Sequence, residues 1–367
     1  AEVDAFRTQA IAEGGPGRGE DHLGHWWELE ARHYFDKQHA RVTSAVLHAP
    51  TKLLIVGFQT GVFALYELPG GGTADGAALV PSAPTSQAPG STAAGGALME
   101  VHTLSISEAR VDACAVSPSG EWLAFGCAQL GQLLVWEWQS ESYVLKQQGH
   151  YFAEVSALAY SPGGTVIATA GGDNKVKLWS PTSGFCFVTF TEHTAPVADL
   201  CFVPHGRALV SASLDGTVRA FDIIRYRNFQ TLVSPEPAQF GCVAVEPSGE
   251  IVCAGSRDTL IIYVWNLQTA QLLETLAGHE GPISCLAFGG DASGAAFLAS
   301  GSWDKTVRVW DFLSSNAAID TLRHSSDVTA LAFSPDGATL ASATLDGQIA
   351  IWDAKQAEQT GSIEGRA

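Results

Sequence analysis

The sequence predicts an all-β fold, a seven-bladed β-propeller, on three observations. One pattern that closes on an aromatic residue occurs seven times, its apolar runs have the length of strands, and Pro-Gly turns separate them. The closing aromatic residues are Tyr66, Trp136, Trp179, Phe221, Trp265, Trp310 and Trp352. From Trp136 onward they lie 42 to 45 residues apart, which fits one four-stranded sheet per repeat.

The repeat has a second mark, a Gly-His pair early and a Trp-Asp pair late, as at 278–279 and 310–311. This pattern resembles the WD repeat, in which four strands make one blade of a propeller. The resemblance implies a seven-bladed WD-repeat β-propeller over residues 26–367.

Two stretches depart from the period. Residues 69–98 are rich in Gly, Ala, Pro and Ser, and without them the first interval falls from 70 residues to 40. Residues 1–25 have a similar composition, which buries too little apolar surface to order a chain. We expect a flexible N-terminal segment at 1–25 and an irregular insertion loop at 69–98.

The sixth repeat shows the expected strands most clearly. Its apolar runs predict strands at 283–288, 297–300 and 306–310, rich in Val, Ile and Leu as sheets buried on both faces require. Turns between the first two strands of a blade are predicted at 117–120, 161–164, 246–249 and 334–337, where Pro presets φ and Gly accepts a positive φ.

Closure of the ring needs a strand from the other end of the chain, because an unpaired sheet edge invites aggregation. The segment 27–35 has the length of a strand and precedes the first repeat. We expect it to be the outer strand of the last blade, with residues 359–364 competing for that edge.

Composition limits the function classes. The net charge of −18 disfavours broad binding to nucleic-acid phosphate. Seven cysteines occur singly without a C-x-x-C pair, which argues against a disulfide framework or a zinc site, and no apolar run is long enough to cross a membrane. We expect no cofactor, metal, small-molecule substrate or membrane partner. The chain begins at Ala1, so we expect a segment of a longer protein.

Four sets of His, Ser or Thr, and Asp recur in a fixed order that imitates a hydrolase triad. One enzyme needs one nucleophile, not four copies on a 40-residue period. We therefore interpret them as structural networks in which Asp accepts from His, His bonds the hydroxyl, and the hydroxyl meets the indole N–H. The sets are His150, Thr169, Asp173 and Trp179; His193, Ser211 and Asp215, with Phe221 in place of Trp; His279, Ser300, Asp304 and Trp310; and His324, Ser342, Asp346 and Trp352. The first, second and fifth repeats lack the full set, and we expect packing alone to hold those blades.

Two groups of residues are candidates for contacts with partners. The residue before each turn Asp should point outward around one mouth of the central channel, together with the residues after His150; these are Leu214, Arg257, Trp303, Leu345, Tyr151 and Phe152. Arg225, Tyr226 and Arg227, near Arg219, form a local basic and aromatic run at the end of the fourth repeat. That run is either a solvated loop or a contact to RNA phosphate or an acidic partner.

Several segments that are not WD consensus resemble the periodic tryptophan protein family of ribosome-biogenesis factors, above all WEWQSESY (136–143) and RYRNF (225–229). The resemblance covers about residues 26–366 and implies one propeller, the second of a tandem pair. It implies a nucleolar, non-catalytic scaffold of the small-subunit processome that acts in precursor ribosomal RNA processing and 40S biogenesis. Its implied partners are other WD-repeat and helical proteins of the UTP-B subcomplex. The alternative is a propeller that contacts precursor ribosomal RNA or small nucleolar RNA directly through Arg225, Tyr226 and Arg227.

Overall fold

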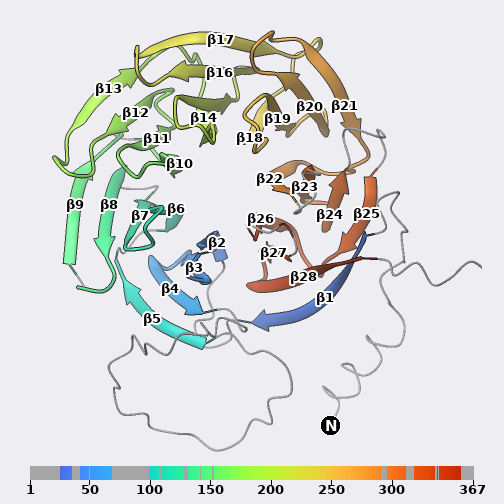
Figure 1. Cartoon of the computed structure of the whole chain (residues 1–367), viewed down its shortest axis with the longest axis horizontal. Helices are drawn as coiled ribbons and strands as arrows, with labels where there is room; N and C mark the ends of the chain where they lie inside the picture. The colour runs from blue at the N-terminus through green and yellow to red at the C-terminus, as the bar shows by residue number, and fades with distance from the viewer. Residues whose placement is uncertain are drawn as a thin grey trace, which may run out of the picture.

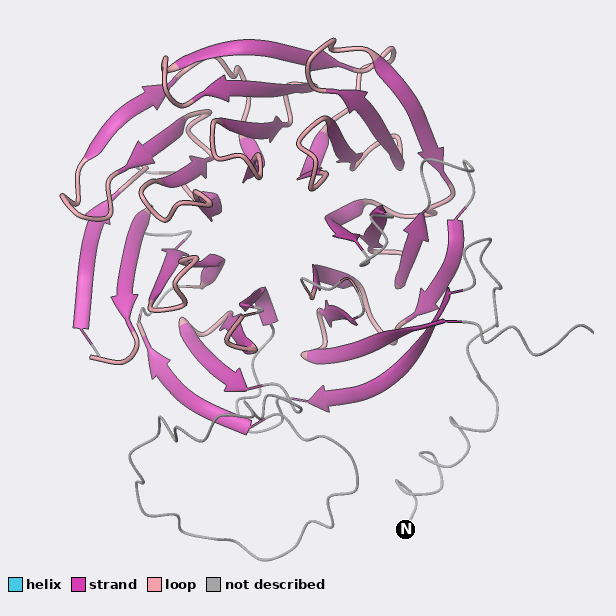
Figure 2. Cartoon of the chain, in the orientation of Figure 1, coloured by secondary structure: helices cyan, strands magenta, loops and turns pink. Residues whose placement is uncertain are grey.

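The computed structural model describes residues 25–34, 42–48, 50–67, 99–106, 110–127, 131–140, 142–150, 153–290, 296–310, 318–334, 337 and 339–356. In these residues seven four-stranded antiparallel sheets are arranged as blades around a central axis (Figure 1). Figure 2 shows that strands and short turns make up the described part of the ring. The predicted all-β propeller is therefore confirmed. The segments expected to be irregular, 1–25 and 69–98, lie outside the described residues except for His25.

The blades follow one another in chain order. Blade 1 has β2 (Val42–His48), β3 (Leu53–Phe58), β4 (Val62–Glu67) and β5 (Met99–Ser105), and blade 2 has β6 (Val111–Val116), β7 (Trp122–Cys127), β8 (Gln132–Glu137) and β9 (Ser142–Gln148). Blade 3 has β10 (Val155–Tyr160), β11 (Ile167–Gly171), β12 (Val176–Trp179) and β13 (Cys186–Phe190), and blade 4 has β14 (Val197–Phe202), β15 (Ala208–Ser213), β16 (Thr217–Asp222) and β17 (Arg227–Val233). Blade 5 has β18 (Phe240–Val245), β19 (Ile251–Ser256), β20 (Ile261–Asn266) and β21 (Leu272–Ala277), and blade 6 has β22 (Ile283–Gly290), β23 (Ala296–Ser302), β24 (Thr306–Trp310) and β25 (Ala318–Arg323). Blade 7 has β26 (Val328–Phe333), β27 (Thr339–Thr344), β28 (Gln348–Gln356) and β1 (His25–Tyr34).

Burial along each blade explains the sequence pattern. The second strands are continuously apolar or small, and every residue of β3 and of β15 is buried, because neighbouring blades cover both faces. Outer strands alternate, as in β13, because one face meets solvent. The seven closing aromatic residues all lie in third strands, where they are buried between adjacent blades.

The predicted Pro-Gly turns join the first two strands of their blades. In blade 2 the Gly120 amide donates to the Ser117 carbonyl at 2.8 Å, and Gly120 has φ of 76°. A Cβ there would lie 2.7 Å from the His48 ring of blade 1. Glycine is needed at this turn both for its backbone conformation and for the close approach of the neighbouring blade.

The ring closes with a strand from the start of the chain. β1 pairs antiparallel with β28, from His25 opposite Gln356 to Tyr34 opposite Gln348, with a register shift between Leu29 and Ala31. In Figure 1 β1 runs along the outside of the last blade. The closure prediction is confirmed for β1, and the competing residues 359–364 lie outside the described residues.

Polar side chains of the inner strands tie neighbouring blades together around the axis. The Ser284 hydroxyl of blade 6 donates to the Val328 carbonyl of blade 7 at 2.6 Å. Asp199 of blade 4 accepts from the Val243 amide of blade 5 at 2.8 Å. Equivalent bonds run from Thr43 to the Val111 carbonyl and from Ser156 to the Val197 carbonyl. Sequence periodicity did not identify this inner set of bonds.

Candidate functional site

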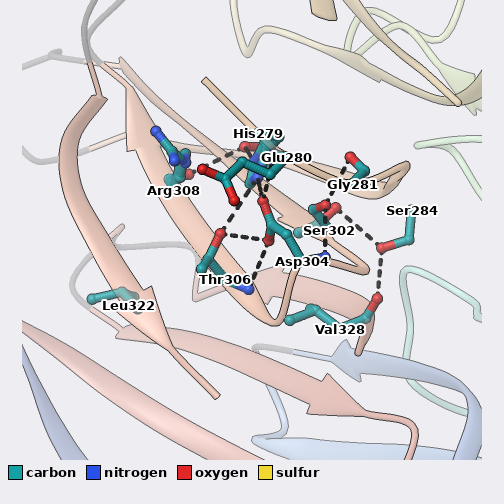
Figure 3. Close-up of polar contacts among 12 residues, drawn as sticks. His279, Glu280, Gly281, Ser284, Ser302, Asp304, Thr306, Arg308, Leu322 and Val328 are labelled. Carbon is teal, nitrogen blue, oxygen red and sulfur yellow. Dashed lines mark hydrogen bonds and ion pairs between the residues drawn. The ribbon is translucent and has the colours of Figure 1, made fainter. Parts of the chain in front are cut away.

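The network of blade 6 contains the hydrogen bonds expected from its sequence, and Figure 3 shows its carboxylate end, with His279, Glu280, Asp304 and Thr306 close together. His279 Nδ1 lies 2.7 Å from Asp304 Oδ2, and His279 Nε2 lies 2.7 Å from Ser300 Oγ. The Trp310 indole N–H donates to the same hydroxyl at 2.8 Å. The backbone amide of Glu280 also donates to Asp304, at 3.1 Å. The network therefore fastens the connection between blades 5 and 6 to the strands of blade 6.

The same geometry occurs in blades 3 and 4. His150 bonds Asp173 at 2.7 Å and Thr169 at 2.9 Å, and the Trp179 indole donates to Thr169 at 2.9 Å. In blade 4, the two bonds of the histidine are His193 to Asp215 at 2.8 Å and His193 to Ser211 at 2.7 Å. The side chain of Phe221 has no N–H donor, and its ring instead stacks on the ring of Phe190 with centroids 4.3 Å apart.

Blade 7 differs from the prediction at its carboxylate. His324 bonds Ser342 at 2.6 Å and the Trp352 indole donates to Ser342 at 2.9 Å. Asp346, however, accepts from the Ser325 hydroxyl at 2.7 Å and from Thr344, while His324 Nδ1 lies 3.3 Å from the Leu322 carbonyl. The prediction of a hydrogen bond between His324 and Asp346 is therefore wrong. The nearby hydroxyls of Ser325 and Thr344 donate hydrogen bonds to the Asp346 carboxylate instead.

Burial and hydrogen bonds together determine the protonation of these networks. Desolvation lowers the pKa of His150 and of His279, which keeps both imidazoles neutral. Burial raises the pKa of Asp215, but hydrogen bonds from His193 and Thr217 outweigh it, so the pKa ends below its ordinary value. The Ser300 hydroxyl is fully buried, which leaves a substrate no route to it. These groups therefore lack the access that nucleophilic catalysis requires.

The repeats without the full set use other contacts. In blade 5 Tyr263 stacks on Trp265 at 5.7 Å, and the buried Trp265 indole N–H has no hydrogen-bond partner among the described residues. Asp258 nevertheless accepts from the Gln239 amide at 3.0 Å. In blade 1 His48 bonds Thr51 at 2.6 Å and reaches the Pro118 carbonyl of blade 2 at 3.3 Å. The expectation that packing alone holds these blades is therefore wrong for blades 1 and 5.

The candidate partner residues that the structure describes occupy equivalent positions in four successive blades. Each follows a second strand, and its amide donates to the carbonyl of the residue directly before the first strand of its blade. These bonds are Leu214 to Pro196, Arg257 to Gln239, Trp303 to Pro282 and Leu345 to Asp327. Trp303 is 54% exposed and Arg257 is exposed, whereas both leucines are half-buried. Tyr151 and Phe152 lie outside the described residues.

The basic candidates lie at the opposite end of blade 4. Arg225, Tyr226 and Arg227 are exposed in and beside the turn between β16 and β17. The structure separates Arg219 from them, because its Nε donates to Thr217 near the other end of β16. It adds Arg207, which sequence reasoning missed, because the Ile223 amide bonds the Arg207 carbonyl at 3.1 Å.

Two searches of the described residues bear on other functions. They contain no group of three or more His, Cys, Asp or Glu residues placed to hold a metal ion. They also contain no helix with the length and apolar character needed to cross a membrane.

Comparison with known proteins agrees with the repeat analysis. The model of the WD domain, G-beta repeat, matches residues 141–180, 184–222, 270–311 and 317–353. The chain is 51% identical to the periodic tryptophan protein 2 homolog of Mus musculus over 92% of its own length and 33% of the relative. It is 46% identical to periodic tryptophan protein 2 of Saccharomyces cerevisiae and 43% identical to that of Arabidopsis thaliana, in each case over 93% of the chain and 34% of the relative. The chain thus spans about one third of the length of these relatives. Its repeats, its seven blades and these identities show that the chain belongs to the periodic tryptophan protein family of WD-repeat proteins.

Proposed function

We propose that this chain is a non-catalytic interaction scaffold of the small-subunit processome, acting in nucleolar precursor ribosomal RNA processing and 40S biogenesis. The periodic tryptophan protein relatives support this assignment. WD-repeat propellers typically serve as scaffolds for protein interactions, and the buried networks of this chain use its recurrent His, Ser and Asp residues for hydrogen bonds within the fold.

The observation that carries the proposal is the set of equivalent rim residues on blades 4 to 7. Trp303 exposes 54% of its surface at a turn that also contains a network carboxylate, so its position is fixed while its ring meets solvent. Exposed Trp and Arg are frequent anchors of protein interfaces because they bury a large area on docking. We name the surface formed by Leu214, Arg257, Trp303 and Leu345 the network-side rim.

The proposed occupants of the network-side rim are other WD-repeat and helical proteins of the UTP-B subcomplex. An interface centred there would bury the apolar surface of Trp303 and Leu214, a gain of roughly 25 cal/mol per Å² before the costs of association. The alternative of a direct RNA contact concerns a different surface, that of Arg225, Tyr226 and Arg227.

The test is a double variant, Trp303→Ala with Leu214→Glu, in the full-length protein. We expect capture of subcomplex proteins to fall about tenfold or more, since each anchor of an interface contributes about 2 kcal/mol. Thermal unfolding verifies that the propeller still folds, and Trp303→Ala alone covers the case in which Glu at half-buried Leu214 destabilises it. Leu273→Ala, an exposed residue of outer strand β21, is the matched control. Normal capture by a folded Trp303→Ala protein would exclude this rim as the main interface.

A further inference from the structure

We propose that the outer surface between blades 3 and 4 binds an acidic segment of a partner protein that also carries apolar side chains. We name this surface the arginine-aromatic rim; it consists of Phe185, Phe187, Arg207, Arg225, Tyr226 and Arg227. It lies at the end of blade 4 opposite the network-side rim, and the inference does not depend on the processome assignment.

Two blades build this surface together. The turn that carries Tyr226 joins β16 to β17, and in Figure 1 the start of β17 lies beside the end of β13 at the circumference. The Phe187 ring of β13 meets the Tyr226 ring edge-on, with centroids 5.9 Å apart and planes at 70°. The bond from the Ile223 amide to the Arg207 carbonyl brings the first hairpin of blade 4 to the same place. The surface is therefore a defined junction of three chain segments.

The aromatic side chains of this junction face water. Phe185 is 70% exposed, Tyr226 is 51% exposed and Phe187 is 43% exposed. Neighbouring Ile224 and Phe229 are exposed as well. Single exposed apolar residues are ordinary, but a group of them on adjacent segments marks an interaction surface.

The backbone holds Tyr226 in a conformation that tyrosine disfavours. Tyr226 has φ of 52°, and the residue at the same distance after the closing aromatic of blade 3 is Gly184, with φ of 73°. A left-handed conformation costs a non-glycine residue roughly 1 kcal/mol or more. The Asp222 carboxylate fixes the turn by accepting from the Ile224 and Arg225 amides at 2.8 and 3.0 Å. The same turn position is left-handed in blade 5, where it is Ala270 with φ of 56°, so in blade 4 a turn of defined conformation presents the exposed side chain of Tyr226.

The positive charge of the arginine-aromatic rim indicates what kind of partner segment binds there. Arg207, Arg225 and Arg227 are exposed on a chain whose net charge is −18. The nearest carboxylate on the turn is Asp222, whose pKa is lowered first by the backbone amides of Arg225 and Ile224 and further by the charges of Arg225 and Arg227. Arginine pairs with carboxylates through two parallel hydrogen bonds and also stacks on aromatic rings. An acidic and apolar peptide segment would therefore satisfy both the guanidinium groups and the exposed rings.

The same observations favour protein over RNA. Non-specific single-stranded RNA binding uses a basic groove that follows many phosphates. Here the arginines gather at one end of one blade, and Glu246 and Glu250 lie on the adjacent first hairpin of blade 5, where His205 bonds the Ser248 carbonyl. The overall negative charge also repels a polyanion more than a short peptide with a few carboxylates.

The experiment selects ligands for the folded chain from a random peptide library displayed on phage. The enriched peptides are then synthesised and their affinities measured by fluorescence anisotropy at low and high salt. The test variant combines Arg225→Ala, Tyr226→Gly and Arg227→Ala. Glycine fits the positive φ of position 226, so this variant should fold, and thermal unfolding confirms it. Leu273→Ala, at an exposed position of outer strand β21 outside both rims, is the control.

We expect the enriched peptides to combine Asp or Glu with aromatic or aliphatic residues. They should bind the triple variant about tenfold or more weakly and bind Leu273→Ala normally, and their affinity for the wild type should fall as salt rises. Enrichment of neutral or basic peptides, no enrichment, or equal binding to the folded triple variant would overturn the proposal. A labelled single-stranded oligouridylate that binds the wild type and is lost in the triple variant, while no acidic peptide binds, would reassign the surface to RNA.

Discussion

The replacement His279→Ala tests whether the recurrent networks are structural. His279 is 7% exposed, and its ring joins Asp304 and Ser300 through two bonds of 2.7 Å each. Alanine removes both bonds and leaves the space of the imidazole empty. Partner binding should be unchanged in the protein that still folds, because the ring lies inside the blade.

The hydrogen bonds that remain in His279→Ala determine how much unfolding free energy the replacement removes. Ser300 keeps the Trp310 indole as a donor, and Asp304 keeps Thr306 and the Glu280 amide. The loss is therefore one bond to a carboxylate, one neutral bond and a partial cavity, about 2 to 4 kcal/mol of unfolding free energy. An unfolding entropy of about 2.1 cal/mol/K per residue makes this a fall in Tm of roughly 3 to 6 °C for a propeller of this size.

The assay is calorimetric or circular-dichroism melting beside capture of the partner proteins. His205→Ala is the matched control, because that exposed histidine has a single hydrogen bond among the described residues, to the Ser248 carbonyl, and its loss should cost less than about 0.5 kcal/mol. A double-mutant cycle with Asp304→Ala should show coupling, since the two side chains are in contact. An unchanged Tm combined with lost partner capture would refute the structural interpretation.

Three further predictions concern the fold. Burial holds the pKa of His150 and His279 below the unfolded value of about 6.5, so their stabilising contribution is present above that pH and is lost as the pH falls through the folded pKa. The Tm difference between wild type and His279→Ala should therefore shrink between about pH 7.5 and pH 5.5. A constant difference would contradict this. Trp265→Phe should cost about 1 kcal/mol less than Trp310→Phe in urea unfolding, because the Trp310 indole N–H has a hydrogen-bond partner and that of Trp265 has none within the described part of the chain; equal costs would show that packing decides both. Deleting residues 25–34 should lower Tm and promote aggregation measured by light scattering, because it exposes the edge of β28; a monomeric deletion variant with wild-type Tm would show that closure does not need β1.

Asp199 and Cys285, two ionisable residues of the inner strands, provide a contrast for the pH experiment. Burial raises the pKa of Asp199 to about 6, so its effect on stability runs opposite to that of the histidines and is lost as pH rises through that value. Asp199 is unchanged in the His279→Ala protein, so comparing the two proteins removes its contribution. Cys285, also on an inner strand, has its pKa raised by burial to about 12 and stays protonated over this range.

Much of the fold is predictable from local sequence because each blade is a local structure. Strands of one blade are consecutive in the chain and are joined by short turns, so the spacing of the closing aromatics determines blade number and the Pro-Gly turns locate the first hairpins. The networks are also predictable, because His279, Ser300 and Asp304 lie at fixed positions within one repeat.

The differences arise where contacts depend on neighbouring groups rather than on the repeat. Asp346 has Ser325 and Thr344 within reach, so it bonds hydroxyls instead of His324, although the repeat pattern is intact. His48 compensates for a missing set in blade 1 by bonding the carbonyl of Pro118 in the next blade. Such contacts depend on the distance between blades, which no periodicity specifies.

The sequence by itself determined the all-β class, the seven blades, the strand that completes the last blade and the grouping of the network residues, because these follow from hydrophobic period and short-range connection. Only the tertiary structure decided that Arg207 joins Arg225 and Arg227 while Arg219 points to Thr217, and that Phe187 meets Tyr226. The physical reason is that the direction of each strand and the packing of adjacent blades determine which distant side chains share a surface. Residue spacing along the chain does not contain that information.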